Sequence, residues 1–177
     1  MQNFLIVVDM QRDFVDGALG TPEAVAILDA VSARIRDWDG PIVVTLDTHQ
    51  ENYLDTAEGK KLPVPHCIRE TEGWELHPVV KEALAGKKYT AVEKPTFGSV
   101  QLPQIIRVLS DGGPVSFTVI GLCTDICVVS NALLLKAHYP ETAIAVDAAC
   151  CAGVTPAAHE AALATMRSCQ IDILNAD

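Results

Sequence analysis

The sequence has no long hydrophobic segment and few basic residues, and both absences narrow what the protein can do. No stretch approaches the roughly 18 apolar residues of a membrane-spanning helix, so we expect no membrane partner. The first residues lack a basic cluster followed by a long apolar core, so we expect no signal peptide and a cytoplasmic location. A net charge of −10 disfavours nucleic acid and anionic membranes as partners, because both attract clustered Lys and Arg.

Internal repeats, low-complexity tracts and linker-like segments are also absent from the sequence. The length of 177 residues fits one domain, since domains usually contain about 100–200 residues. We therefore expect a single domain over residues 1–177. In the cytoplasm the six cysteines should be thiols, which are either packed in the interior or available for chemistry.

Short apolar runs rich in β-branched residues alternate with segments of helical periodicity. The runs predict strands at residues 4–8, 42–46, 89–93, 115–122, 143–147 and 171–174. The other segments predict helices at residues 24–35, 79–84, 102–109, 124–137 and 156–167, with Thr21 and Pro22 suited to begin the first. This alternation predicts an α/β fold: a single-domain, Rossmann-like, six-stranded parallel sheet with helices on both faces.

Reactive side chains follow the carboxyl ends of four predicted strands. Asp9 follows the first strand, Asp47 and His49 the second, and Lys94 the third, while Cys127 lies just past the fourth. Ligands of open α/β sheets bind at this edge, so we interpret it as the candidate site.

Cys127 is the candidate nucleophile of this group. Thr124 can cap a helix whose first turn contains Cys127, and the N–H groups there lower a thiol pKa and can hold an oxyanion. Lys94 would stabilise the thiolate and Asp9 would carry its proton. The alternative is that Cys127 is a small buried apolar residue, and the spacing alone favours that alternative.

A second group is suited to a metal ion. Asp47 and His49 open a segment of about 25 residues without clear periodicity, and His66 lies near its end. Two imidazoles and a carboxylate leave coordination positions open, as in catalytic zinc sites, and they also suit iron or manganese. Glu58 is a further candidate ligand. The alternative is that both histidines form hydrogen bonds within the loop and Glu58 is solvated.

The remaining reactive residues are expected to be structural. We expect packed thiols, with no disulfide between the adjacent pair, at Cys67, Cys150, Cys151 and Cys169. Surface or capping roles are expected for His77, His138 and His159. Trp38 is expected to pack at a helix end, whereas Trp74 either packs or lines a pocket.

Three segments resemble the isochorismatase-like cysteine hydrolases. They are VDMQRDF at 8–14, KPTFGS at 94–99 and GLCTDICV at 121–128, and the resemblance spans essentially the whole chain. It implies that Asp9, Lys94 and Cys127 form a catalytic triad.

The same resemblance implies a cis peptide between Leu122 and Cys123. In this family the cis peptide directs the N–H groups of Cys123 and Cys127 toward an oxyanion.

Residues 46–49 (LDTH) and 63–67 (PVPHC) are similar to the metal-binding segments of the nicotinamidase-like branch of this superfamily. The resemblance implies hydrolysis of the linear amide nicotinamide to nicotinate and ammonia, a step of NAD salvage. One divalent ion, with zinc ahead of iron or manganese, is then expected on Asp47, His49 and His66, with Glu58 as an optional fourth ligand.

The resemblance also implies substrate contacts. Phe14 matches a usual ring contact, Phe97 is a second candidate, and Pro63 occupies a position where many nicotinamidases carry tryptophan. One alternative is another hydrolase of the superfamily, acting on a carbamoyl compound or a vinyl ether. The other alternative is a non-catalytic thiol- or metal-binding module. The sequence leaves open the exact substrate, the metal and whether the chain forms a homo-oligomer.

Overall fold

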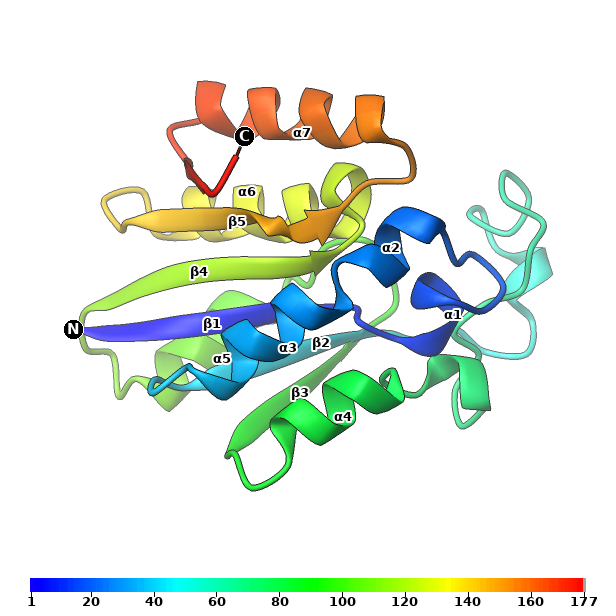
Figure 1. Ribbon diagram of the computed structural model, residues 1–177, viewed down its shortest axis with the longest axis horizontal. Coiled ribbons are helices and arrows are strands. Elements are labelled where there is room, and N and C mark those ends of the chain that lie inside the picture. Colours follow the sequence, from blue (N-terminus) through cyan, green and yellow to red (C-terminus); the bar gives the residue numbers. More distant parts are fainter. Residues whose placement is uncertain (177) are drawn as a thin grey trace.

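A parallel sheet forms the centre of the computed structural model, which describes residues 1–176 (Figure 1). The strand order is β3-β2-β1-β4-β5-β6, and each pair of neighbouring strands is parallel. The strands are β1 (Gln2–Val8), β2 (Ile42–Asp47), β3 (Tyr89–Lys94), β4 (Val115–Leu122), β5 (Ile144–Ala152) and β6 (Asp172–Leu174). The predicted six-stranded α/β fold is therefore confirmed.

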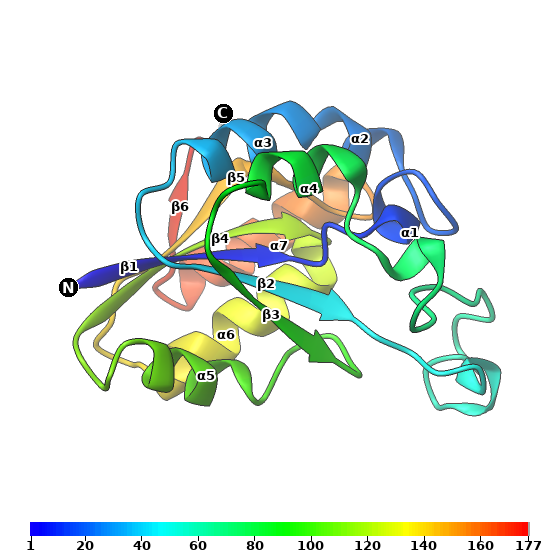
Figure 2. The same cartoon turned by 90° about the horizontal axis from the view of Figure 1, so that it is seen from below.

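Helices cover both faces of this sheet. They are α1 (Arg12–Val15), α2 (Pro22–Ala26), α3 (Leu28–Arg36), α4 (Pro78–Leu84), α5 (Leu102–Leu109), α6 (Val129–His138) and α7 (Pro156–Ser168). Figure 2 shows α2, α3 and α4 above the sheet and α5 and α6 below it. Residues of α7 pack into the same core as those of α5 and α6.

The central strand β1 divides its side chains between the two cores. Phe4, Ile6 and Val8 face the core under α5, α6 and α7. Leu5 and Val7 face the core under α3 and α4. All five side chains are inaccessible to solvent. A strand buried on both faces accounts for the continuous apolar run in the sequence.

Two predicted helices differ in detail from those observed. The first begins as expected, since Thr21 Oγ1 accepts the N–H of Ala24 at 3.0 Å, but it is interrupted at Ile27 between α2 and α3. The segment after β4 begins with a π-helical turn, Thr124–Val128, before α6. Its N-cap is Cys123, so the predicted N-cap role of Thr124 is wrong: the Thr124 hydroxyl contacts His159 Nδ1 at 2.8 Å instead.

Strand β5 extends five residues beyond its predicted end at Asp147. The strand continues because Cys151 and Ala152 pair with Gly121 and Leu122 of β4 after a register shift. Asp147 does not end the strand because it is buried and its charge is paired with Arg34.

The connection between β2 and α4 is the long aperiodic segment that the sequence predicts. It contains two short 3₁₀ turns, η1 (Tyr53–Asp55) and η2 (Glu72–Trp74). Its start and end are held together by a β-bridge between His49 and Ile68. The segment lies beyond the carboxyl end of β2 (Figures 1 and 2). Within residues 1–176, no helix has the length and hydropathy to cross a membrane.

Candidate active site

Asp9 lies directly after β1 in a backbone conformation that is rare for a residue with a side chain. Its φ is +47°, in the left-handed region. On the neighbouring strand, Gly121 has a φ of +119°, and a Cβ there would lie 2.1 Å from the carbonyl oxygen of Val8. The close approach of β1 and β4 therefore fixes the point at which Asp9 enters the site.

Lys94, the last residue of β3, lies between the other two predicted catalytic residues. Its Nζ is 2.7 Å from Asp9 Oδ2 and 3.6 Å from Cys127 Sγ. Nζ also donates to Asp47 Oδ1 at 3.2 Å and to the Thr96 carbonyl oxygen at 3.0 Å. Because this ammonium is buried, two carboxylates rather than water balance its charge. The structure thus brings together Asp9, Lys94 and Cys127.

The protonation of the three residues follows from burial and from their mutual contacts. Burial raises the pKa of the Cys127 thiol well above its ordinary value; Asp9 adds to the rise, and Lys94 opposes it. Burial likewise raises the pKa of Asp9, again against the effect of Lys94. Burial alone would lower the pKa of Lys94, but Asp9, Cys127 and Asp47 outweigh it, so that pKa is raised.

The expectation that the helix start lowers the Cys127 pKa is therefore wrong for the site as it stands. The pKa is shifted upward because the side chain is removed from water, which disfavours the charged thiolate. After burial, the charge of Asp9 is the next largest cause of the rise in this pKa.

Two backbone N–H groups near Cys127 are candidates for binding an oxyanion. The peptide bond between Leu122 and Cys123 is cis, as the resemblance implies. Within residues 1–176, neither the Cys123 N–H nor the Cys127 N–H donates a hydrogen bond beyond its own helical turn. Binding of an oxyanion by these two groups stays a prediction.

The four predicted metal ligands lie together beside the catalytic residues. One donor atom from each of Asp47, His49, Glu58 and His66 lies within 4.8 Å of all the others. His49 Nε2 is 3.0 Å from Asp47 Oδ2 and 3.7 Å from Glu58 Oε1. His66 Nε2 is 3.6 Å and 3.8 Å from the same two oxygens.

The orientation of His66 suits metal binding. Its Nδ1 lies 2.9 Å from the carbonyl oxygen of Val64, so Nδ1 can carry the proton and Nε2 can present a lone pair to the group. Two imidazole nitrogens and two carboxylate oxygens match the donors of a divalent transition metal. These four side chains can hold one such ion.

Asp47 links the two groups. Its Oδ1 accepts from Lys94, while its Oδ2 faces His49 and His66. Burial acts to raise the Asp47 pKa, but its contacts with His49 and His66 and the charge of Lys94 hold it well below its usual range. Asp47 is therefore a permanent anion between the lysine and the metal group.

A small pocket opens between the catalytic and metal groups. Its lining residues are Phe14, Leu19, Asp47, Glu58, Leu62, His66, Phe97, Cys123, Ile126 and Cys127. Both predicted ring contacts, Phe14 and Phe97, are among them. Trp74 and Pro63 are not, and the Trp74 indole N–H donates to Thr48 Oγ1 at 2.8 Å instead.

Sequence reasoning missed three residues that hold the site in place, of which Gln11 and Asn131 are fully buried. The Gln11 amide donates to the carbonyl of Asp47 and accepts its N–H, at 2.8 and 2.7 Å. Asp13 accepts the N–H of Cys67 at 2.8 Å. Asn131 donates to the carbonyl of Cys127 at 2.8 Å. Gln11 and Asp13 alternate with Asp9 along one polar segment, and that alternation was the available signal.

The remaining reactive residues are mostly structural, as expected. All six cysteines are free, and those at 67, 150 and 151 are buried. Cys169 is exposed, so its predicted packing is wrong; it lies at the end of α7, where no further layer covers it. His77 caps α4 by accepting the N–H of Val79 at 3.4 Å.

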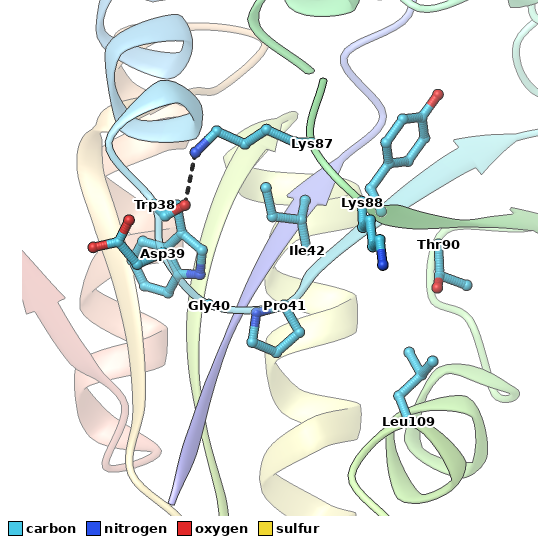
Figure 3. Close-up of a pocket in the computed structure, with 10 residues that line it drawn as sticks. Trp38, Asp39, Gly40, Pro41, Ile42, Lys87, Lys88, Thr90 and Leu109 are labelled. Carbon is cyan, nitrogen blue, oxygen red and sulfur yellow. Dashed lines mark hydrogen bonds between the residues drawn. The ribbon is translucent and has the colours of Figure 1, made fainter. Parts of the chain in front are cut away.

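A larger, open hollow contains none of the predicted site residues. It measures about 530 Å³ and lies at the opposite, amino edge of β2 and β3, where Trp38, Lys87 and Lys88 line it (Figure 3). Lys87 Nζ donates to the Trp38 carbonyl oxygen at 2.7 Å. Reactive groups therefore gather at the smaller hollow, not at the larger one.

Comparison with known proteins yields a consistent set of relatives. A family model described as the isochorismatase domain matches residues 3–177. The nicotinamidase/pyrazinamidase of Mycobacterium tuberculosis is 26% identical over 183 residues, which cover 96% of this chain and 97% of that protein.

Solved structures share the fold along their whole length. The nicotinamidase/pyrazinamidase of Bacillus subtilis superposes with a TM-score of 0.85 at 25% identity, covering 99% of this chain and 100% of that one. The pyrazinamidase of Pyrococcus horikoshii in complex with zinc gives 0.82 at 28% identity, covering 98% and 99%.

Proposed function

The chain belongs to the isochorismatase family, and from that premise we propose that it hydrolyses nicotinamide to nicotinate and ammonia. The observation that carries this proposal is the shared pocket. Cys127, beside Lys94 and Asp9, lines it together with members of the metal group. Residues 1–177 would form one catalytic domain whose partner is this small amide.

We propose that Asp9 acts as the general base. It takes the Cys127 proton while Lys94 stabilises the resulting thiolate. The thiolate sulfur bonds to the amide carbonyl carbon, and the carbonyl electron pair moves to the oxygen, which the N–H groups of Cys123 and Cys127 hold.

The second half of the reaction releases both products. Asp9 returns its proton to the amide nitrogen, the carbon–nitrogen bond breaks, and ammonia leaves. A water molecule, deprotonated by Asp9, then attacks the thioester, and the carbon–sulfur bond breaks. Asp9 returns the proton to the Cys127 sulfur, and the nicotinic acid releases its proton to solvent as nicotinate.

We propose that Asp47, His49, Glu58 and His66 hold one divalent ion, with zinc ahead of iron or manganese. The convergence of the four donors supports this, and so does the zinc of the Pyrococcus horikoshii relative. When bound, the ion would offer a position for a ring nitrogen if Glu58 stays unbound or the coordination expands beyond four. Elemental analysis after purification without chelator should find about one ion per chain. Activity unchanged by chelation and by His49→Ala would contradict this role.

An ammonia-release assay tests the proposed function. Nicotinamide should exceed benzamide clearly in kcat/KM, because benzamide has the amide and the ring but no ring nitrogen. Cys127→Ala should abolish release, whereas Cys169→Ala, at an exposed thiol, should not. Equal turnover of both amides would point to another hydrolase of the family. No turnover of any amide in a panel would favour the non-catalytic alternative.

A further inference from the structure

Leu62 and Phe97 are exposed apolar side chains at the mouth of the pocket. Their exposed fractions are 39% and 43%, although both line the pocket. An apolar side chain in this position gains burial when a ligand covers it, in proportion to the area removed from water. The two residues are therefore placed to contribute to the binding of the acyl group.

Leu62 is carried on the same turn as a member of the metal group. The N–H of Leu62 donates to the Glu58 carbonyl oxygen at 2.8 Å, and the N–H of Lys61 donates to the same oxygen at 2.9 Å. Residues 58–62, here the Leu62 turn, thus present a carboxylate and an apolar wall to one pocket.

A buried tyrosine holds the Leu62 turn in place. Tyr53 Oη donates to the Leu62 carbonyl oxygen at 2.9 Å, and its side chain is almost completely buried. The Tyr53 ring centroid lies 4.7 Å from that of His49 and 5.0 Å from that of His66. The position of Leu62 is therefore set relative to the candidate metal ligands.

The turn has no room to move toward η1. A Cβ on Gly59 would lie 2.1 Å from the Tyr53 carbonyl oxygen. Thr56 Oγ1 accepts the Gly59 N–H at 3.0 Å and donates to that same oxygen at 2.7 Å. The wall that Leu62 provides is thus a fixed surface rather than a side chain on a loose loop.

We propose that Leu62 is a specificity-determining residue, and that this aliphatic wall lets the pocket accept acyl groups without requiring a planar ring. The inference rests on the proposed function. Leucine gains dispersion contacts with any ring, whereas aromatic pairs add a geometric preference of about 0.5–1.5 kcal/mol. The pocket therefore takes carboxamides of both planar and saturated six-membered rings.

The test combines turnover with binding. Leu62→Ala should raise KM for nicotinamide about tenfold through lost apolar burial, with kcat within about twofold. Leu54→Ala is the matched control, since Leu54 is a half-exposed leucine of η1 that does not line the pocket. Metal content should be equal in all variants, which shows that Glu58 is undisturbed.

Binding is measured by calorimetry in a Cys127→Ala background, with benzamide and cyclohexanecarboxamide as probes. Leu62→Phe should shift the ratio of their Kd values by about three- to tenfold in favour of benzamide. An unchanged ratio, or a KM for Leu62→Ala within twofold of wild type, would overturn the inference. If the affinity for these rings depends on Leu62 but protein with Cys127 intact releases no ammonia, the proposed function is refuted and the role of Leu62 in binding is retained.

Discussion

The two edges of the sheet differ in whether their charged side chains are exposed or buried. At the amino edge, a cavity of about 530 Å³ is lined by the exposed Lys88 and Asp39. At the carboxyl edge, a much smaller pocket adjoins three buried charged side chains, Asp9, Asp47 and Lys94. Charges removed from water interact far more strongly than solvated ones. Convergent buried charge is thus a better guide to chemistry here than cavity volume.

The largest difference between the two edges is expected when a lysine at each edge is replaced. Lys94→Met should lower kcat/KM about a thousandfold, because the thiolate loses its stabilising charge. It should also cost about 3–5 kcal/mol of unfolding free energy, since Asp9 and Asp47 lose their buried partner. Ammonia release and urea denaturation measure the two effects.

Lys88→Met is the matched change at the amino edge. Because water already screens this charge, activity and stability should stay within about twofold and 0.5 kcal/mol of wild type. Equal losses in the two variants would mean that the edges do not differ as described.

The two edges also differ in how tightly the backbone is packed. Gly121→Ala places a Cβ 2.1 Å from the Val8 carbonyl oxygen at a φ of +119°. Displacement of β1 should lower the unfolding free energy by about 2–4 kcal/mol and reduce activity through Asp9.

Gly86, in the loop before β3, also has a positive φ, but a Cβ there would meet open space. Gly86→Ala should cost only the conformational strain of about 1–2 kcal/mol and leave kcat unchanged. Thermal melts and kcat measurements on both variants test this difference. A smaller loss of stability in Gly121→Ala than in Gly86→Ala would contradict the packing argument.

A smaller effect is expected at Gln11, whose buried amide holds the backbone of Asp47. Gln11→Leu should weaken metal affinity about 10–100-fold, as is usual when a group that orients a ligand is lost. Competition with a chelator measures this affinity. Gln101→Leu, at an exposed position, is the control, and matching affinities in the two variants would remove Gln11 from the account.

A further effect is expected on stability at alkaline pH. Burial raises the pKa of Cys123 to about 12 and that of Cys150 to about 11, and it also raises the pKa values of Cys67, Cys127 and Cys151. Unfolded thiols lose their protons near pH 9, while the folded ones keep them. The unfolded state then binds fewer protons, so stability falls as pH rises above about 9.

Each such thiol adds up to about 1.4 kcal/mol per pH unit to that fall. Cys151→Ala and Cys151→Val both remove one thiol, but alanine leaves a cavity whereas valine is slightly larger than cysteine. Both should therefore flatten the slope of unfolding free energy against pH between 9 and 11. A slope equal to that of wild type would show that the Cys151 thiol does not contribute.

The sequence alone was enough to locate the reactive edge. Buried parallel strands read as apolar runs, and their carboxyl ends share one edge, so polar residues just after them must lie close together. This placed Asp9, Asp47 and Lys94 correctly. It also predicted the grouping of His49 and His66, because both flank the one long loop.

Other features depend on packing between distant segments and could not be predicted. Strand β5 continues past Asp147 because Arg34, a residue of α3, pairs with this buried carboxylate. The Cys127 pKa is raised because burial, with the charge of Asp9, outweighs the opposing charge of Lys94. Leu62 reaches the pocket only because Tyr53 and the turn at Glu58 hold it there.

The central claim is that Cys127 forms a covalent bond to the acyl group while Asp9 and Lys94 serve it. Acid quenching during turnover of nicotinamide, followed by peptide mass spectrometry, tests this most directly. A nicotinoyl adduct should appear on Cys127 and not on Cys123, and it should be absent from the Cys127→Ala variant. The account would be contradicted if ammonia were released without any adduct on Cys127 and if the Cys127→Ala variant still released ammonia.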